Sequence, residues 1–148
     1  MGTRSTLQIK DDDGTNLVSL YRQYDGYPTG MGMEIKTALN NGQVELLNGF
    51  DSDSFIPKNF NGMACLGAFI IGALKGVKAD VENYTFKGAT GQIGGIYLTT
   101  PDDRQAYDYF LAPTKDGSTV NMRVETGGRE IFNGLLSEFD GQLVEENE

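Results

Sequence analysis

The sequence contains no histidine and only one cysteine in 148 residues. The absence of histidine excludes Ser-His-Asp and Cys-His catalysis, histidine general bases and the common zinc sites. A single cysteine, Cys65, excludes an intrachain disulfide. Its place in the apolar run 63–66 favours a small buried hydrophobic residue over a reactive thiol. An enzyme built from this chain would therefore depend on carboxylates, lysine, tyrosine, serine or threonine.

Long apolar runs and basic residues are also scarce. No stretch approaches the length of a membrane span, and the first residues contain no apolar signal region, so we expect a soluble cytoplasmic protein without membrane contact. Lys and Arg number 12 against 21 Asp and Glu, a formal net charge of −9. Such a surface repels phosphate backbones and argues against general nucleic-acid binding. The net charge does not exclude a small anionic ligand in a local basic pocket, nor an acidic patch that docks on a basic partner.

The length fits one domain, 1–148, and the clearest local signal is a β-hairpin. Asp13-Gly14 is a strong two-residue turn signal between two segments, 4–10 and 17–23. Pairing around this turn sets Ile9 opposite Val18 and Leu7 opposite Leu20. One face is then apolar, and the other is polar with one aromatic residue.

A second hairpin is predicted around Asp116-Gly117. Its register sets Leu111 opposite Met122 and Tyr109 opposite Val124, again with the apolar residues on one face. Strands are also expected at 84–87 and 96–99. We therefore predict an α+β fold, an antiparallel sheet built on two β-hairpins with two or three helices packed on it.

Three helices are predicted from apolar spacing. One runs from about 31 to 39, with Met31, Ile35, Ala38 and Leu39 as its inner residues. The second runs from 61 to 78, with Met63, Leu66, Ile70, Leu74 and Val77 at helical spacing, and the third runs from 129 to 139. The second helix contains so many glycines that we expect it to press closely against a sheet or another helix. Residues 43–58 are ambiguous between a helix extension and a loop, and about 141–148 reads as a frayed acidic tail.

The most informative segment is the loop that leaves the first hairpin, residues 22–28. Tyrosines offer flat faces for stacking, arginines bind phosphate or carboxylate, and glycines allow close approach to the backbone. The structural alternative is a rigid corner in which Asp25-Gly26 turns the chain, the tyrosine rings pack beneath it and Arg22 pairs with Asp25. The hairpin register directs Arg22 toward the apolar face, where its charge needs a carboxylate or a bound anion. The predicted ligand-binding residues are Arg4, Tyr21, Arg22, Tyr24, Asp25 and Tyr27.

Other motifs are weaker. Asp11-Asp-Asp-Gly14 has the wrong spacing for an EF-hand and is read as a solvated turn. The glycine-rich segment 88–95 lacks the dinucleotide-binding pattern. Gly127-Gly128-Arg129 opens the predicted last helix and could hold an anion there. Asp102 and Asp103 could bind a metal, although neighbouring carboxylates in a turn usually face water.

The N-terminal stretch resembles a group of small, uncharacterised phage and bacterial proteins. The resemblance lies in Met-Gly-Thr-Arg-Ser at 1–5 and in Tyr-Arg-Gln-Tyr-Asp-Gly-Tyr-Pro-x-Gly-x-Gly at 21–32, and it covers about the first 40 residues. It implies a phage or mobile-element accessory protein in the host cytoplasm. It transfers no established activity, and interference with host defence is the role that it suggests.

These observations lead to three hypotheses. The first is a non-catalytic accessory protein that sequesters a small anionic, nucleotide-like ligand or docks on a host protein. The second is a nucleotide or phosphodiester hydrolase in which Asp25, Asp102 or Asp103 holds a metal. The third is a protein-docking or virion accessory protein. The first expects no catalytic residues, metal or cofactor, and a homo-oligomeric assembly is left open.

Overall fold

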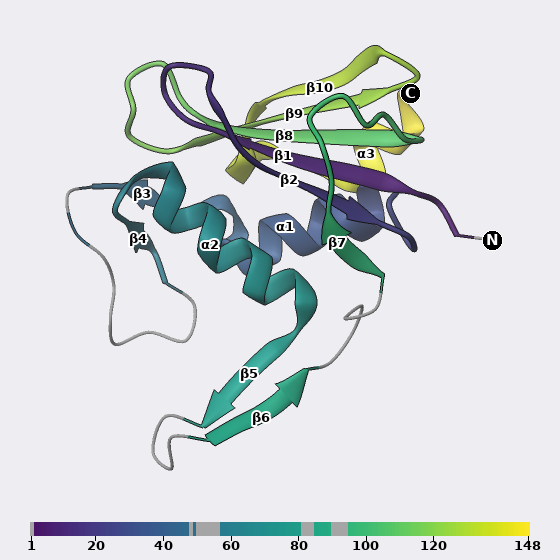
Figure 1. Ribbon diagram of the computed structural model, residues 1–148. Coiled ribbons are helices and arrows are strands. Elements are labelled where there is room, and N and C mark those ends of the chain that lie inside the picture. The colour runs from purple at the N-terminus through teal and green to yellow at the C-terminus, as the bar shows by residue number, and fades with distance from the viewer. Residues whose placement is uncertain (1, 48, 50–56, 81–84, 90–94) are drawn as a thin grey trace.

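The computed structural model describes residues 2–47, 49, 57–80, 85–89 and 95–148, and its main feature is a six-stranded sheet with helices against one face (Figure 1). In chain order the elements are β1 (Ser5–Lys10), β2 (Asn16–Arg22), the π-helix η1 (Pro28–Gly32), α1 (Met33–Ala38), the 3₁₀ helix η2 (Asn40–Gly42), β3 (Glu45–Leu46), β4 (Asn59–Phe60), α2 (Gly62–Lys75), β5 (Val77–Asp80), β6 (Thr85–Ala89), β7 (Ile96–Leu98), β8 (Tyr107–Pro113), β9 (Val120–Thr126), β10 (Arg129–Leu135), the 3₁₀ helix η3 (Leu136–Glu138) and α3 (Gly141–Glu146).

The two predicted hairpins are confirmed with the predicted registers. In β1–β2, Leu7 pairs with Leu20, and in β8–β9, Leu111 pairs with Met122. Each turn contains a glycine with positive φ, and an aspartate preceding that glycine accepts a backbone hydrogen bond from beyond it. Local turn chemistry therefore fixes which side chains share a face.

The hairpins are joined by a parallel pair in the middle of the sheet. The strand order is β10-β9-β8-β1-β2-β7, and β1 runs parallel to β8 with Ser5 beside Tyr107 and Ile9 beside Leu111. Every other neighbouring pair in this sheet is antiparallel. The prediction of an antiparallel α+β sheet is thus confirmed, with this one parallel pair as the addition.

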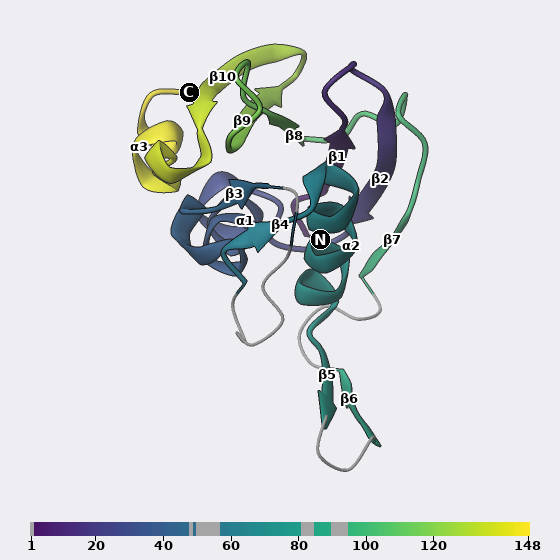
Figure 2. The ribbon, with the colours of Figure 1, turned by 90° about the vertical axis from the view of Figure 1, so that its left-hand side faces the viewer.

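Helices α1 and α2 cover the apolar face of the sheet (Figures 1 and 2). The expected inner residues of α2 are buried: Met63, Leu66, Ile70 and Leu74. The helix ends at Lys75, before the predicted 78, because Gly76 adopts the left-handed conformation that closes a helix. The remaining predicted residue, Val77, begins β5.

The expected close packing of the glycines in α2 is found at one position. A Cβ built on Gly67 would lie 3.3 Å from Ile9 Cγ2, whereas one built on Gly62 or Gly72 would meet nothing within 4 Å. Cys65 lies nearby, half-buried against the core. None of the helices in the described ranges is long and apolar enough to cross a membrane.

The predicted helix at 31–39 forms as two consecutive pieces, η1 and α1. Its expected inner residues Met31, Ile35 and Leu39 are buried, and Ala38 is half-buried. Asn40 and Asn41 both take positive φ and end the helix where the sequence predicted. Val44–Leu47 does not extend this helix, since Glu45–Leu46 forms β3 beside β4.

The C-terminal prediction is wrong in two places. Residues 129–135 form β10, an edge strand paired with β9, rather than a helix. Gly127 and Gly128 both have positive φ, the geometry of a two-residue hairpin turn, so this turn decides the structure against the helix-like apolar spacing. The anion site expected at a helix start is therefore absent from this turn.

The predicted acidic tail is also ordered. Residues 141–146 form α3, and Asp140 caps this helix by accepting hydrogen bonds from the backbone N–H groups of Gln142 and Leu143. Val144 is buried against the core. A capping aspartate and one apolar anchor therefore hold a segment whose composition alone suggested fraying.

The face of the sheet opposite the helices is polar, as the hairpin register predicted, but it is covered. Thr6, Gln8 and Asp108 are each at most 2% exposed. The connection between β7 and β8 lies over them, with the Gln8 amide donating to the Pro101 carbonyl at 2.7 Å. We call this face the outer face. At its centre, the β7–β8 connection packs over the polar side chains and buries them.

Strands β5 and β6 form a hairpin that projects from the body (Figures 1 and 2). β6 and β7 coincide closely with the strands predicted at 84–87 and 96–99. Tyr84 itself, much of the glycine-rich segment 88–95 and the expected loop at 51–54 lie outside the described residues.

Candidate functional site

The sheet divides the predicted site residues between its two faces. Because side chains alternate along β2, Arg22 lies on the helix-covered face with Leu20, whereas Tyr21 lies on the outer face. Asp25 and Tyr27 accompany Arg22. Arg4, which follows the alternation of β1, accompanies Tyr21. The predicted residues therefore do not form one site.

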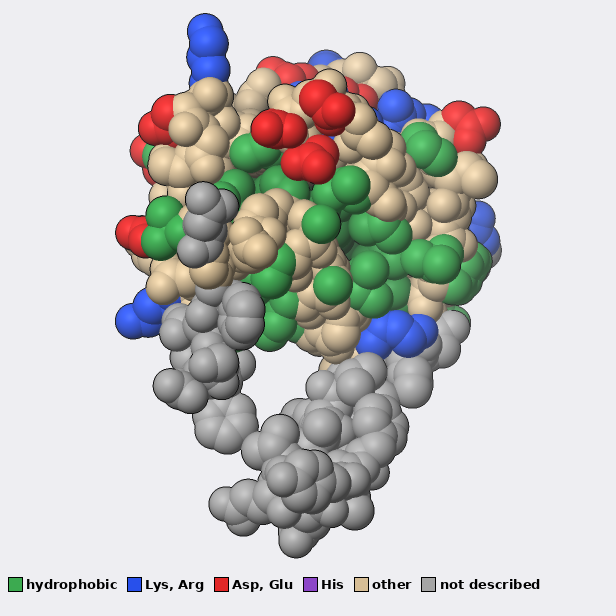
Figure 3. All heavy atoms as spheres, turned by 60° about the vertical axis from the view of Figure 1, so that its left-hand side comes forward, with side chains coloured by type: hydrophobic (Ala, Val, Ile, Leu, Met, Phe, Trp, Pro, Cys, Tyr) green, Lys and Arg blue, Asp and Glu red, His purple; other side chains and the backbone are tan. Residues whose placement is uncertain are grey.

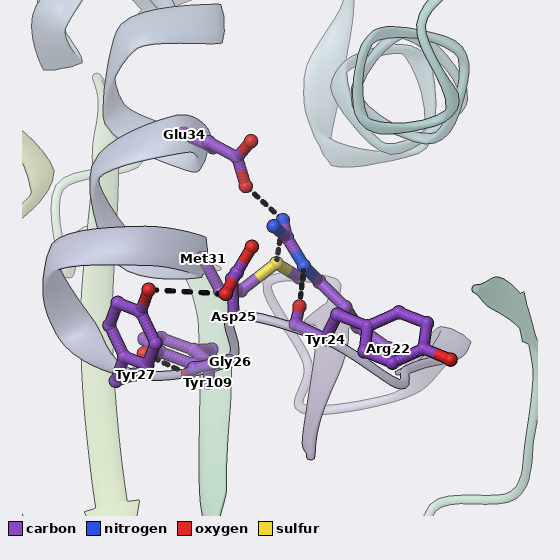
Figure 4. A network of polar contacts seen from close by, with 8 residues as sticks. All are labelled: Arg22, Tyr24, Asp25, Gly26, Tyr27, Met31, Glu34 and Tyr109. Carbon is purple, nitrogen blue, oxygen red and sulfur yellow. Dashed lines mark hydrogen bonds and ion pairs between the residues drawn. The ribbon is translucent and has the colours of Figure 1, made fainter. Parts of the chain in front are cut away.

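Arg22 is almost completely buried, with 2% of its side chain exposed. Its Nε donates to the Tyr24 carbonyl at 2.6 Å, and its Nη1 donates to the Met31 sulfur at 3.3 Å and forms an ion pair with Glu34 (Figure 4). The expectation that Arg22 requires a partner is confirmed, and that partner is a carboxylate of the protein. Glu34 was not among the predicted site residues.

The loop after Arg22 is closely packed. Asp25 takes a positive φ of 57°, and its carbonyl accepts the Met31 N–H at 2.9 Å. A Cβ on Gly30 would lie 2.3 Å from that carbonyl oxygen, so the approach requires glycine. The Tyr27 hydroxyl donates to Asp25 Oδ1 at 3.1 Å (Figure 4), and this hydrogen bond raises the pKa of Tyr27. The corner expected from the turn residues is therefore present.

Gly26 has a separate structural role. The hydroxyl of the buried Tyr109 donates to the Gly26 carbonyl at 2.7 Å, and a Cβ on Gly26 would lie 2.6 Å from Ser5 Oγ. Burial raises the pKa of Tyr109 well above its ordinary value. The loop is thus fastened to the centre of the sheet at the same point where it bends.

A cleft of about 470 Å³ opens between this loop, α1 and α2. Asp25 and Glu34 border it, and Glu34 is 52% exposed. The carboxylate of Glu145 lies beside its wall, accepting hydrogen bonds from Thr29 N and Oγ1 at 2.9 and 2.8 Å. The lining residues are Arg22, Asp25, Tyr27, Thr29, Gly30, Met33, Glu34, Thr37, Ala38, Ala73 and Leu74. We call this the acidic cleft.

The exposed side of α2 continues one wall of the acidic cleft. Ala64, Ala68 and Ala73 are exposed, Phe69 and Ile71 are half-buried, and the helix carries no charged side chain before Lys75. On the molecular face shown in Figure 3, hydrophobic side chains gather in a band across the middle. An apolar surface therefore adjoins the acidic rim.

The outer-face group has a different chemistry. Tyr21, 7% exposed, stacks on Tyr97 of β7 with ring centroids 4.7 Å apart and planes 28° from parallel. Burial is the main cause that raises the pKa of Tyr21, and the charge of the exposed Arg4 opposes it. Tyr97 was not among the predicted site residues. The available signal was its position in the strand predicted at 96–99, where side chains alternate between the two faces.

A shallow hollow of about 430 Å³ lies beside Arg4, lined by Gly2, Thr3, Arg4, Gln105 and Ala106. Tyr24, 53% exposed, points its ring away from Asp25 and Glu34 (Figure 4). That ring lies against Gly2, where a built Cβ would be 2.5 Å from Tyr24 Cδ1. Tyr24 therefore adjoins the Arg4 hollow instead of the cleft that Asp25 borders.

The carboxylates proposed for a metal-dependent hydrolase are not gathered in one place. Asp25 borders the acidic cleft, whereas Asp102 and Asp103 lie in the turn after β7, where they accept hydrogen bonds from Thr100 and Thr99. Among the described residues, no group of three or more Asp, Glu or Cys side chains has a geometry suited to a metal ion. The three aspartates of the hydrolase hypothesis therefore do not form one metal site.

Comparison of the chain with protein-family models, curated proteins and solved structures gave no match. Function is therefore inferred from the residues themselves.

Proposed function

We propose that this protein is a non-catalytic binding protein that docks on a partner protein through the acidic cleft, which receives a lysine or arginine side chain of the partner. The observation that carries the proposal is the excess of carboxylates around the cleft. Asp25 and Glu34 border the cleft and Glu145 lies beside its wall, whereas Arg22, which is paired with Glu34, is the one cationic side chain among the lining residues.

The shape and polarity of the cleft suit such a side chain. Lysine and arginine have an apolar stem and a cationic head, so they match an apolar wall ending in carboxylates. Met33, Ala73 and Leu74 supply apolar surface, and the exposed alanines of α2 extend it for neighbouring residues of the partner. The net charge of −9 favours encounter with a basic partner.

The resemblance of 1–5 and 21–32 to phage and bacterial accessory proteins supports a host protein as that partner. Within this proposal, the role is inhibition of a host defence component by occupation of its surface. A small anionic ligand in the same cleft is the rival, and it requires Glu34 to leave Arg22.

The proposal is tested by selecting peptides that bind the purified protein from a displayed library of short random sequences. We expect selected peptides to be enriched in Lys and Arg. Their affinity, measured by fluorescence polarisation, should fall at least about fivefold in Asp25→Asn, which corresponds to about 1 kcal/mol. Asp12→Asn is the matched control, since it removes the same charge at an exposed hairpin turn.

Glu34→Gln separates the two ligands. It removes one negative charge from the rim of the cleft, so basic peptides should bind more weakly and acidic peptides more tightly than to the native protein. Selection of acidic peptides by the native protein, or peptide affinities that neither cleft variant changes, would contradict docking of a basic partner.

A further inference from the structure

We infer that the outer face of the sheet carries a second binding site, independent of the acidic cleft, which takes a planar anionic ligand of the nucleoside monophosphate type. The site consists of the Tyr21–Tyr97 stack and the guanidinium of Arg4. Sequence reasoning selected Arg4 and Tyr21 for ligand binding, and the cleft uses neither of them.

The stacked pair is a preformed platform. Tyr21 and Tyr97 are direct cross-strand partners between β2 and β7, so the sheet itself sets their contact. The Tyr21 hydroxyl is fixed by donation to Gln23 Oε1 at 2.6 Å. Tyr21 is 7% exposed and Tyr97 is 55% exposed, so the pair offers Tyr97 to solvent. A ring already held by its neighbour loses little freedom when a ligand stacks on it.

The cation beside the platform is Arg4. It is exposed, and its charge acts on Tyr21 across the adjacent strand. Among the described residues, no carboxylate forms an ion pair with Arg4, in contrast to Arg22 and Arg123. The nearby Asp103 has both carboxylate oxygens engaged, by Thr99 at 2.7 Å and Gln105 at 2.6 Å.

The spacing fits a base joined to a phosphate. Tyr97 is level with Tyr21 and Thr6 in the sheet, so Arg4 lies two residues (about 7 Å) along and two strands (about 10 Å) across from it. An extended arginine side chain covers about half of that distance, and the ribose between a base and its phosphate bridges the rest. The hollow lined by Gly2, Thr3 and Gln105 gives the anion room beside Arg4.

Isothermal titration calorimetry of the full chain with 5′-AMP, adenosine, ribose 5-phosphate and inorganic phosphate tests this site. We expect saturable binding of 5′-AMP, with each fragment at least about tenfold weaker, because stacking and charge act on different parts of the ligand. The chain has seven tyrosines and no tryptophan, so quenching of tyrosine emission gives a second readout. Binding should weaken as salt is raised.

The variants distinguish a site from a sheet-stabilising ring pair. Tyr97→Leu and Arg4→Gln should each weaken 5′-AMP binding at least about fivefold, whereas Tyr97→Phe, which keeps the ring, should bind as the native protein does. Arg129→Gln, which removes an exposed arginine at the start of β10, is the charge control. Circular dichroism checks folding, and Arg4→Gln decides the test if Tyr97→Leu does not fold.

Three outcomes would overturn the inference. They are the absence of saturable binding of 5′-AMP at millimolar concentration, equal binding of adenosine and 5′-AMP, and affinity that neither Tyr97→Leu nor Arg4→Gln changes. Because the probes and variants here differ from those of the acidic cleft, failure of one site leaves the other undecided.

Discussion

Arg22 at the end of β2 and Glu34 in the first turn of α1 form an ion pair in which the arginine is 2% exposed and the glutamate 52%. The pair joins the sheet to the helix across the loop that they bracket. A buried cation with a half-exposed partner is held in place by its hydrogen bonds as much as by its charge.

Because the two side chains differ in burial, substitution of Arg22 should lower the free energy of unfolding more than substitution of Glu34. Arg22→Met should reduce the free energy of unfolding by about 1–3 kcal/mol, because the Tyr24 carbonyl loses its donor. Glu34→Gln should cost less, about 1 kcal/mol, because solvent screens the exposed carboxylate. Urea unfolding of both variants and of the double variant gives the coupling energy. Additivity of the two changes within about 0.3 kcal/mol would show that the pair contributes nothing of its own.

Tyr109 predicts a dependence of stability on alkaline pH. Its pKa is raised well above the unfolded value of about 10, so the neutral folded form contributes stability fully below pH 10, and this contribution is lost as pH rises further. Tyr109→Phe should cost about 1–2 kcal/mol at pH 7, because the Gly26 carbonyl loses its donor. It should also flatten the fall above pH 10. Urea unfolding from pH 7 to 11 measures both effects, and an unchanged slope in the variant would assign the fall to other tyrosines.

Substitution of Gly42, which lies outside both proposed sites, should have a large effect on stability. Its φ is +84°, and a Cβ there would lie 2.3 Å from Ser137 N. Gly42→Ala should therefore cost on the order of 3 kcal/mol through strain and backbone clash. Gly117→Ala is the matched control, because Gly117 has φ +75° with nothing within 4 Å and should cost about 1 kcal/mol. Equal thermal destabilisation of the two variants would mean that the Ser137 backbone gives way.

The N-cap at Asp140 should stabilise the C-terminal helix α3. Asp140→Ala removes an N-cap that accepts two backbone hydrogen bonds, so it should cost about 1 kcal/mol. Hydrogen exchange should quicken selectively in 141–146. Asp12→Ala, at an exposed turn, should change neither quantity, and a frayed terminus would make the two variants indistinguishable.

The sequence determines the parts of the fold that depend on local chemistry. Asp13-Gly14 and Asp116-Gly117 fix turn geometry, and alternation then fixes each register, so both hairpins were predictable residue by residue. The parallel pairing of β1 with β8 was not, because contacts between residues about 100 positions apart leave no periodic signal. The strand at 129–135 was mistaken for a helix because its apolar residues also fit a helical spacing.

The candidate site was predictable in part, because side chains alternate between the two faces of a strand. Alternation indicated that Arg22 would lie inward and need a partner, but whether Glu34 could reach it depends on the angle between α1 and the sheet. The same alternation sets Tyr21 on the opposite face, so treating Arg22 and Tyr21 as one site conflicted with the register. The role of Tyr97 required knowledge of which strand lies beside β2.

The parallel pairing of β1 with β8 also bears on how the chain folds as it is made. The first hairpin is complete once residue 22 has been synthesised, but its inner strand lacks a neighbour until Pro113 has emerged. The loop at Gly26 likewise waits for Tyr109. Contacts this distant in sequence slow folding, since the intervening chain must be closed into a loop first. The nascent hairpin therefore exposes a strand edge until β8 has been made, and one of the two central strands of the finished sheet is made before all the others.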